Sequence, residues 1–210
     1  MIQHPQSRPS TLRLIDGTSF EGISFGAYKS VVGEVVFNTG MVGYPETMTD
    51  PSYRGQILVM TYPLIGNYGI PGDERKHGLL EYFESDHIHV QGLIIGSYSP
   101  HYSHWSAVRS LSDWMSDHDI PGIYGVDTRL ITQKLREQGT MLGVMIADEE
   151  LDFKDPNTSN LVQEVSVTDT IEYNAGSKKI ILIDCGVKNN IIRAFVKRNI
   201  TVIRVSWDYP

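Results

Sequence analysis

Cysteine is nearly absent from this sequence, which has one, Cys185, in 210 residues. A single cysteine excludes an internal disulfide framework and is typical of proteins from reducing compartments. No run approaches the ~18 consecutive apolar residues of a membrane-spanning helix, and the N-terminus lacks the apolar stretch of a secretory leader. Internal repeats and low-complexity segments are also missing. The sequence therefore predicts a globular protein that spans no membrane.

Positive charge is the scarcer sign, with 18 Lys and Arg against 25 Asp and Glu and a formal net charge of −7. An acidic balance argues against a nucleic-acid surface and more often serves solubility. The first residues carry two arginines and no acid before Asp16, which permits an organelle presequence. We therefore expect a cytoplasmic protein, with a mitochondrial location as the alternative, and neither a nucleic-acid nor a membrane partner.

Runs of β-branched and aromatic residues dominate the first half and predict strands. These runs cover 11–15, 33–38, 56–62 and 89–98. Asp16-Gly17 lies between two such stretches and predicts a tight hairpin turn. The pattern predicts a β-rich body joined by turns rather than alternating βαβ units.

Two later segments have the apolar spacing of amphipathic helices. In the first, the apolar positions are Trp105, Val108, Leu111, Trp114 and Met115. The second lies between Asp127, a predicted N-cap, and Gly139, a predicted C-cap. Its predicted buried stripe is Leu130, Ile131 and Leu135. The residues 140–147 then return to a strand pattern.

The composition changes after residue 148, where polar and turn-forming residues precede a linker-like stretch. Residues 179–184 then form an apolar run, typical of a parallel strand buried on both faces. A helix is predicted over 188–199 and a strand over 200–206. The predicted buried face of this helix is Ile191, Ile192, Phe195 and Val196. One βαβ unit cannot cover both faces of its own sheet. We therefore expect the start of a second, doubly wound domain, with residues 180–183 and 202–205 exposed where nothing covers them.

The most distinctive run is "GEVVFNTGMVGYPETMTDPSYRGQILVMTYPLIGNYG", residues 33–69. Within it, Asp50-Pro51 favours a turn that presents Ser52. This run resembles the N-terminal signature of the small subunit, or glutaminase component, of glutamine-dependent carbamoyl phosphate synthetase. "GVDTRLITQKLREQGTMLG" (125–143) is similar to its second signature, and "DCGVKNNIIRAFVKR" (184–198) to the opening of its glutaminase domain. The resemblance extends over roughly 11–208 and favours the eukaryotic versions.

The resemblance implies an α/β fold in three parts. Residues 1–172 correspond to a β-rich N-terminal β/β/α domain of the carbamoyl phosphate synthetase small-subunit type. Residues 173–179 correspond to a linker. Residues 180–210 correspond to the first βαβ of a flavodoxin-like class I glutamine amidotransferase domain, truncated here.

The resemblance also implies a function. The full family member hydrolyses glutamine with a cysteine, a histidine and a glutamate, and passes ammonia to a large ATP-using synthetase that makes carbamoyl phosphate for pyrimidine or arginine synthesis. The G-I-C-x-G and H-P-E motifs that carry this chemistry do not occur here, and no histidine follows His118. We therefore expect the isolated chain to be inactive and to hold no cofactor, with ATP and Mg²⁺ belonging to the synthetase partner. That partner is a large subunit or a fused synthetase domain. The alternative is a non-catalytic docking module that binds the same partner.

Two residues carry over from the family, and the role of each is implied by the resemblance. Ser52 matches a serine that reaches towards bound glutamine, where a hydroxyl can donate and accept hydrogen bonds. Lys188 matches a lysine at a βα turn, where its charge would pair with an acidic group or hold the junction. The alternatives are turn capping for Ser52 and a solvated lysine for Lys188. Cys185 does not match the family nucleophile and is predicted to be a buried small hydrophobe.

The histidines give weaker signals. His87 and His89 lie two apart on one strand face, but no third ligand has suitable spacing, so we expect no metal. His101 and His104 are predicted to cap or pack. "CGVKNN" follows a strand but lacks G-x-G-x-x-G, so no nucleotide-binding turn is expected.

Overall fold

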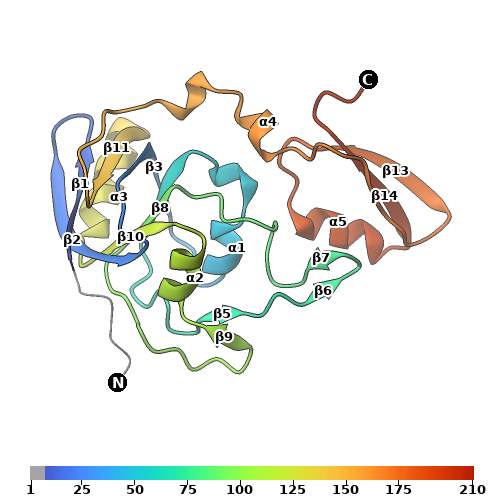
Figure 1. The fold of residues 1–210 in the computed structure, drawn as a ribbon, viewed down its shortest axis with the longest axis horizontal. Helices are drawn as coiled ribbons and strands as arrows, with labels where there is room; N and C mark the ends of the chain where they lie inside the picture. The colour runs from blue at the N-terminus through green and yellow to red at the C-terminus, as the bar shows by residue number, and fades with distance from the viewer. Residues whose placement is uncertain (1–7) are drawn as a thin grey trace. The chain divides into compact units, whose positions relative to one another are not determined.

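The computed structural model describes residues 8–210, which form two compact units (Figure 1). The barrel unit contains the described residues up to Tyr44, together with Gly55–Gly72 and Val90–Pro156. The C-terminal unit contains Pro45–Arg54, Asp73–His89 and Asn157–Pro210. Each unit is therefore assembled from three separate segments of the chain. Within residues 8–210, no helix has the length and apolar character needed to cross a membrane.

Seven strands of the barrel unit close into a barrel in the order β1-β11-β3-β4-β8-β10-β2. They are β1 (Pro9–Leu14), β2 (Ser19–Gly26), β3 (Val31–Asn38), β4 (Gln56–Met60), β8 (Gly92–Ile95), β10 (Pro121–Tyr124) and β11 (Met141–Ile146). β1 and β2 form the hairpin predicted at Asp16-Gly17, where Gly17 has φ of 86°. That prediction is confirmed because a tight turn depends only on local residues.

The barrel mixes parallel and antiparallel pairs. β3, β4, β8 and β10 are parallel neighbours, whereas β1, β2 and β11 make the antiparallel pairs. Parallel neighbours need long crossover connections, so the expectation of a body joined simply by turns is wrong for this half of the barrel. The barrel core includes Leu12, Leu14, Val35, Ile57, Val59, Ile94, Ile123, Val144 and Met145, each buried.

Helix α3 (Thr128–Gln138) follows β10 and is confirmed with both predicted caps. The Asp127 side chain accepts a hydrogen bond from Leu130 N at 3.0 Å, and Gly139 has φ of 86°. Ile131 and Leu135 are buried as predicted, but Leu130 is 52% exposed. The buried stripe turns instead towards Thr128 and Thr132, which are 6% and 7% exposed.

The helix predicted from Trp105 onwards is wrong in its first half. Residues Ala107–Arg109 form strand β9, which pairs with β5 (Ile70–Pro71). Helix α2 (Leu111–Asp117) begins only after Ser110, whose hydroxyl accepts from Asp113 N at 3.1 Å. Trp105 and Val108 are 86% and 60% exposed. The apolar spacing continues through Ser110, but Ser110 is the N-cap of α2, and the helix therefore cannot begin before it.

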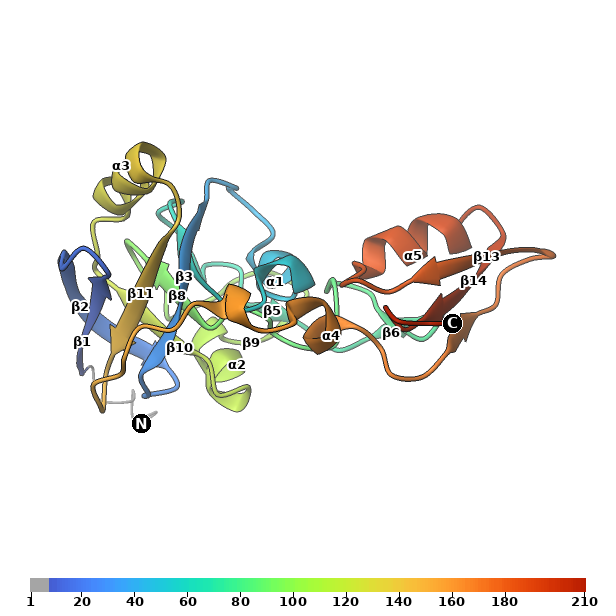
Figure 2. The same ribbon diagram turned by 90° about the horizontal axis from the view of Figure 1, so that it is seen from above.

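The C-terminal unit is built on a three-stranded sheet in the order β12-β14-β13. The strands are β12 (Ile171–Tyr173), β13 (Lys178–Ile183) and β14 (Ile200–Val205), with α5 (Asn189–Val196) between the last two (Figure 2). β13 and β14 are parallel, so the predicted βαβ unit is confirmed. β12 is antiparallel to β14 and was not predicted. Strand residues occupy both ends of the predicted linker 173–179, and the domain boundaries stay a prediction.

Short elements complete both units. They are α1 (Tyr44–Met48), η1 (Pro51–Tyr53), β6 (Arg75–Lys76), β7 (Leu79–Leu80), η2 (Pro156–Thr158) and α4 (Leu161–Val165). η1, β6, β7 and α4 belong to the C-terminal unit.

One face of the C-terminal sheet is covered and the other is open. Val202, on the covered face, is fully buried with Ile192 and Val196 of α5, together with Leu79 and Tyr173. Val205 is also buried, at 1% exposure. The prediction that Val202 and Val205 are exposed is therefore wrong. Ile181 and Ile183 are 65% and 59% exposed, as expected of an uncovered face. The prediction of a strand buried on both faces is wrong for β13, and Ile191 of α5 is 45% exposed.

Candidate functional site

Asp50 fixes the turn that carries Ser52. Its carboxylate accepts a hydrogen bond from Ser52 N at 3.0 Å and caps η1, which Pro51 opens. Proline suits the first helical position because its missing N–H would have no partner there. Ser52 is exposed, and its hydroxyl makes no hydrogen bond to another residue within 8–210. The capping role considered for Ser52 therefore falls to Asp50, and the hydroxyl is left available. Its contact with glutamine stays a prediction.

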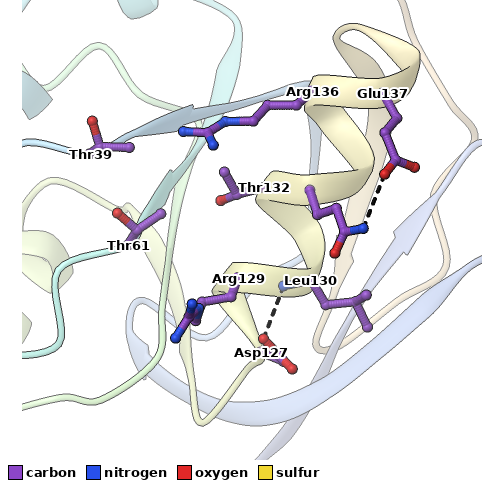
Figure 3. A pocket seen from close by; sticks show the side chains of 9 residues that line it. Thr39, Thr61, Asp127, Arg129, Leu130, Thr132, Arg136 and Glu137 are labelled. Atoms are coloured by element: carbon purple, nitrogen blue, oxygen red, sulfur yellow. Dashed lines mark hydrogen bonds between the residues drawn. The ribbon is translucent and has the colours of Figure 1, made fainter.

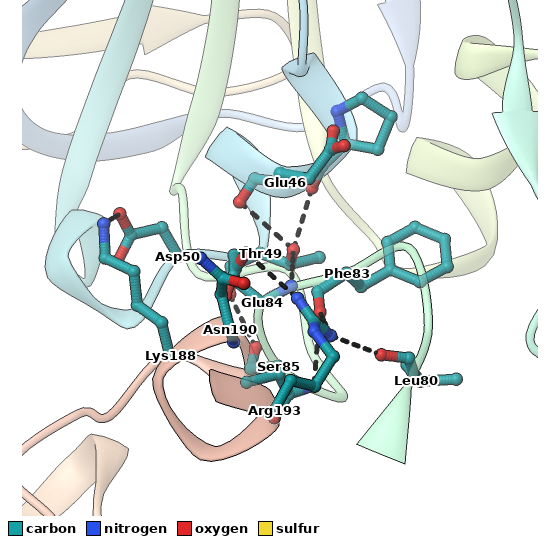
Figure 4. Close-up of polar contacts among 12 residues, drawn as sticks. Glu46, Thr49, Asp50, Leu80, Phe83, Glu84, Ser85, Lys188, Asn190 and Arg193 are labelled. Carbon is teal, nitrogen blue, oxygen red and sulfur yellow. Dashed lines mark hydrogen bonds and ion pairs between the residues drawn. The ribbon is translucent and has the colours of Figure 1, made fainter. Parts of the chain in front are cut away.

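Lys188 joins the same carboxylate (Figure 4). Its Nζ lies 2.5 Å from Asp50 Oδ2, and the two side chains are 43% and 10% exposed. The hydrogen bond to Asp50 raises the pKa of Lys188, while burial acts in the opposite direction. Lys188 thus has the acidic partner that the sequence led us to expect. Ser52 and Lys188, far apart in the sequence, are brought together through Asp50, which the sequence indicated only as a turn former.

A second carboxylate, Asp184, builds the βα turn that precedes Lys188. It is fully buried at the end of β13. Oδ1 accepts from Gly186 N and Val187 N at 3.0 and 2.9 Å, and Oδ2 accepts from Val167 N at 2.8 Å. Arg204 of β14 lies 2.6 Å from Oδ2. Sequence reasoning missed this residue, although a carboxylate after an apolar strand and before a glycine was the available signal.

Cys185 is exposed, so its predicted burial is wrong. Asp184 takes the interior position at the end of the strand, and the next residue must therefore face outwards. The chain then turns at Gly186, which has φ of 94°. Cys185 therefore does not pack in the interior.

Replacing Gly186 by alanine should destabilise the C-terminal unit by about 2 kcal/mol, because a side chain is strained at positive φ. An added Cβ would also lie 3.0 Å from Val165 Cγ2 and 3.2 Å from Pro51 Cβ. Gly78→Ala is the matched control, since Gly78 has φ of 82° with open space around it. Urea unfolding of both variants measures the difference. Equal losses of stability in the two variants would show that Val165 and Pro51 move aside without an energetic penalty.

The N-terminus of α5 is held by a partly buried ion pair. Arg193 Nη2 lies 3.2 Å from Glu84 Oε1, and the two side chains are 15% and 14% exposed. Arg193 Nη1 also donates to the carbonyls of Leu80 and Phe83 at 2.7 and 3.1 Å (Figure 4). Glu84 Oε2 accepts from Asn190 N at 2.8 Å. These bonds fix the helix that follows Lys188, and so fix the direction in which Lys188 approaches Asp50.

Thr49 connects this ion pair to the Asp50 turn. Its hydroxyl accepts from Glu84 N at 3.0 Å and donates to Pro45 O at 2.8 Å. Nearby, burial raises the pKa of Glu46, with the charge of Glu84 adding to the effect. Residues 45–54, 80–85 and 188–193 therefore form one polar cluster, which we call the Asp50 cluster (Figure 4).

His87 and His89 lie in the segment between β7 and β8, so the prediction that they share one strand face is wrong, and their surroundings differ. His87 is exposed, whereas His89 is 7% exposed with Nε2 3.0 Å from Ser85 Oγ. Burial, then the charge of Arg54, lowers the pKa of His89 to about 4. Within residues 8–210, no three His, Cys, Asp or Glu side chains are grouped so as to hold a metal ion. His101 and His104 form the other histidine pair. His104 Nδ1 lies 2.8 Å from Ser106 Oγ, which is a local hydrogen bond between neighbouring residues.

The low pKa of His89 should make stability fall in acid. Between pH 6.5 and about 4 the unfolded chain binds a proton at this residue while the folded chain does not. Stability therefore rises with pH in that window, and about 3 kcal/mol is lost on going from pH 7 to pH 4. Urea unfolding over this range, compared with His89→Gln, isolates the contribution. An unchanged pH dependence in the variant would contradict it.

The barrel unit has a separate, shallow cavity of about 730 Å³ along α3 (Figure 3). Arg129 and Arg136 extend from the helix beside it, with Thr39 and Thr61 opposite. Asp127 and Glu137, as well as both arginines, line the cavity, so its formal charges cancel. Neither Ser52 nor Lys188 belongs to it, and we assign it no chemistry.

Residues 12–145 match the family described as "Carbamoyl-phosphate synthase small chain, CPSase domain". The chain therefore belongs to the carbamoyl-phosphate synthase small-chain family, and the resemblance seen in the sequence is confirmed. Its strand-rich α/β fold with a closed seven-stranded barrel is the fold of this family member.

Curated relatives are similar over nearly the whole chain. "Multifunctional protein CAD" of Squalus acanthias is 53% identical over 206 residues, which are 95% of this chain and 9% of that protein. "Carbamoyl phosphate synthase arginine-specific small chain" of Saccharomyces cerevisiae is 52% identical over 208 residues, 95% of this chain and 51% of that one. "Carbamoyl-phosphate synthase [ammonia], mitochondrial" of Mus musculus is 47% identical over 208 residues, 97% of this chain and 14% of that protein. The chain thus spans about half of the yeast small chain and a smaller share of the others.

Proposed function

We propose that the chain acts as the N-terminal part of the glutamine-hydrolysing component of a glutamine-dependent carbamoyl-phosphate synthase. This component would supply ammonia to an ATP-using synthetase, a separate large subunit or a fused domain, which makes carbamoyl phosphate from bicarbonate. The observation that carries the proposal is 52% identity over 95% of the chain to a carbamoyl phosphate synthase small chain. ATP and Mg²⁺ would bind the synthetase partner.

Ser52 and Lys188 have separate roles in this proposal. The exposed Ser52 hydroxyl would contact the carboxylate or ammonium group of glutamine, because a hydroxyl serves either as donor or as acceptor. Lys188 would act as a positioning residue, since it holds the Asp50 carboxylate that in turn holds Ser52 N. The open hydroxyl and the shared carboxylate support these roles.

The βαβ unit would be the opening of a flavodoxin-like class I glutaminase domain. Its parallel strands β13 and β14, with α5 between them, support this proposal. In it, residues 1–172 form the small-subunit N-terminal domain, 173–179 the linker and 180–210 the glutaminase opening. The catalytic cysteine, histidine and glutamate are not supplied by this chain, which would be inactive alone. A cytoplasmic location is proposed, with a mitochondrial one as the alternative.

A chimera tests the proposal. This chain would replace the corresponding half of the yeast small chain, and carbamoyl phosphate synthesis would be measured with the yeast synthetase partner. We expect glutamine-dependent synthesis from the chimera and no glutamine hydrolysis from this chain alone. A folded chimera that binds the partner but supports only ammonia-dependent synthesis would overturn the proposal.

In the chimera, Ser52→Ala should raise the KM for glutamine by about tenfold, because one hydrogen bond to a charged group is lost. The ammonia-dependent rate should not change, since that reaction does not use the glutamine site. Ser116→Ala, at an exposed serine of α2, is the matched control. An unchanged KM in Ser52→Ala would remove Ser52 from the glutamine contact.

A docking module is the alternative. Met41, Val42 and Leu64 lie on loops that follow β3 and β4, and they are 67%, 78% and 51% exposed. Such apolar side chains in the barrel unit are suited to a protein interface. Val42→Asp should abolish capture of the synthetase component by this chain, whereas Ile15→Asp, at a 52% exposed residue, should not. A well-folded chain that captures no synthetase component would exclude docking.

A further inference from the structure

The shallow cavity along α3, to which no catalytic chemistry is assigned, has the features of an anion-binding site. Its volume of about 730 Å³ lies within the range of small-molecule sites. Its walls hold two cationic side chains, Arg129 and Arg136, and the hydroxyls of Thr39, Thr61 and Thr132. All five residues belong to the barrel unit, and none takes part in the proposed glutamine chemistry.

The two arginines of the cavity have no counter-charge. Arg129 and Arg136 form no ion pair with a carboxylate among residues 8–210. The remaining cation of the same helix, Lys134, is paired with Asp16 at 2.6 Å and does not line the cavity. A guanidinium group without such a partner keeps its fork of N–H donors for an incoming phosphate.

The two acidic residues that line the cavity do not neutralise these arginines. Asp127 caps the helix by accepting a backbone N–H of the first turn, where the positive end of the helix dipole offsets its charge. Glu137 accepts from Gln133 Nε2 at 3.0 Å. It points away from Thr39 and Thr61, whereas the two arginines extend towards the side of these threonines (Figure 3). The arginine side of the cavity therefore stays positive.

The spacing along α3 sets the shape of the ligand. Arg129, Thr132 and Arg136 recur at three- and four-residue steps and so share one face of the helix. The two arginines are two turns apart, about 10 Å along the helix axis. Their guanidinium groups extend separately rather than converging (Figure 3). A ligand that engages both must therefore be elongated, with an anionic group at each end.

The threonines opposite the helix add donors. Thr39 and Thr61 directly follow β3 and β4, parallel neighbours that end together at the pair Asn38 and Met60. The Thr61 hydroxyl donates to Asn38 O at 3.4 Å, and the Thr39 hydroxyl has no partner among residues 8–210. A free hydroxyl can donate to a phosphate oxygen. The ring of Phe37, also on β3, lies 5.4 Å from the guanidinium of Arg136 and holds it beside this strand.

We propose that the cavity along α3 binds an elongated small molecule with a phosphate group at each end. One phosphate would accept from Arg136 and from the Thr39 hydroxyl, and the other from Arg129. The remaining hydroxyls of the cavity would meet polar groups of the connecting chain. This site shares no residue with the Ser52 turn, so it does not depend on the proposed function.

Hexane-1,6-diyl bisphosphate is the probe, added to the whole chain, because its extended form suits a spacing of two helical turns. ¹⁵N-edited NMR follows the Nε–H groups of Arg129 and Arg136. We expect both signals to shift together and to saturate, with a Kd of about 0.1–1 mM. Ethane-1,2-diyl bisphosphate is too short to reach both arginines, and hexyl phosphate has one phosphate. Each should bind about tenfold more weakly, because one charge-assisted contact is lost.

Substitutions test the two arginines separately. Arg129→Gln and Arg136→Gln should each weaken binding of the long bisphosphate by about tenfold, to the level of hexyl phosphate. Lys134→Gln is the matched control, since it removes the same charge from the same helix outside the cavity. It should change the Kd by less than about twofold, because salt screens the more distant charge. Ser52→Ala should leave the Kd unchanged, which separates this test from that of the proposed function.

Three results would each overturn the proposal. One is equal affinity for the long bisphosphate, the short bisphosphate and hexyl phosphate, which would show only a general attraction of anions. Another is full affinity for the long bisphosphate in Arg129→Gln or Arg136→Gln. The third is tighter binding of an acidic peptide, with glutamates at its first and fourth positions, which would make this surface a protein-docking site. The ligands are compared on the wild-type chain, so the test holds even if a variant fails to fold.

Discussion

Replacing Asp184 by asparagine should lower the free energy of unfolding of the C-terminal unit by about 3–5 kcal/mol. The fully buried carboxylate accepts from three backbone amides and from Arg204. Asparagine would turn an N–H₂ group towards some of these donors and leave the partly buried Arg204 charge without a counter-charge. Urea unfolding followed by circular dichroism, with hydrogen exchange at Val167 and Gly186, measures the loss.

The same substitution at Asp119 is the control, because Asp119 pairs with Lys29 at the surface and its side chain is 74% exposed. Exposed pairs contribute little, so a change below about 1 kcal/mol is expected there. The double variant Asp184→Asn/Arg204→Met should recover part of the loss, because it removes the stranded charge. A loss at Asp184 no larger than at Asp119 would contradict the structural role assigned to this carboxylate.

The second large effect is expected at Arg193. Arg193→Met should cost about 3 kcal/mol, because it leaves the partly buried Glu84 charge without its counter-charge and removes the donors to Leu80 and Phe83. The measurement is a double-mutant cycle with Glu84→Gln, read by urea unfolding. The double variant should be less destabilised than the sum of the two single variants.

Arg198→Met is the control for Arg193, since Arg198 is exposed and donates only to Ala194 O. A near-neutral result is expected for it. Strict additivity in the Arg193 and Glu84 cycle would mean that the two charges do not stabilise one another, and would count against the pair as the anchor of α5.

Features that depend on neighbouring residues were predictable from the sequence. The turn at Gly17 and the caps of α3 at Asp127 and Gly139 are local, and all three occur as predicted. The prediction that Trp105 and Val108 belong to a helix is wrong for a local reason as well. Ser110 is a typical N-cap residue, and this signal outweighs the apolar spacing before it. The parallel pairings of the barrel and the addition of β12 depend on contacts between distant segments, which periodicity does not encode.

The candidate site was predictable only in part. Resemblance to a family supplied Ser52 and Lys188, but no local pattern could show that Asp50 holds both. The thiol of Cys185 was predicted to be buried but is exposed. The neighbouring carboxylate of Asp184, for which no role was predicted, is the buried group. A lone apolar residue after a strand is ordinarily buried, and only the five donors gathered from three segments make burial of the carboxylate favourable.

The C-terminal unit takes its residues from Pro45–Arg54, Asp73–His89 and Asn157–Pro210. During synthesis this unit can therefore be completed only after the barrel unit. All barrel strands are synthesised before Asn157, so the barrel can close before the chain reaches Lys188 and Arg193. Until then, Asp50 and Glu84 lack these ion-pair partners. At ordinary rates of synthesis, of about 5–20 residues per second, the 36 residues between Asn157 and Arg193 take about 2–7 s. During that time the ribosome-bound chain carries a finished barrel with two unpaired segments. A pause in translation between these segments would lengthen the interval in which chaperones or proteases can reach them.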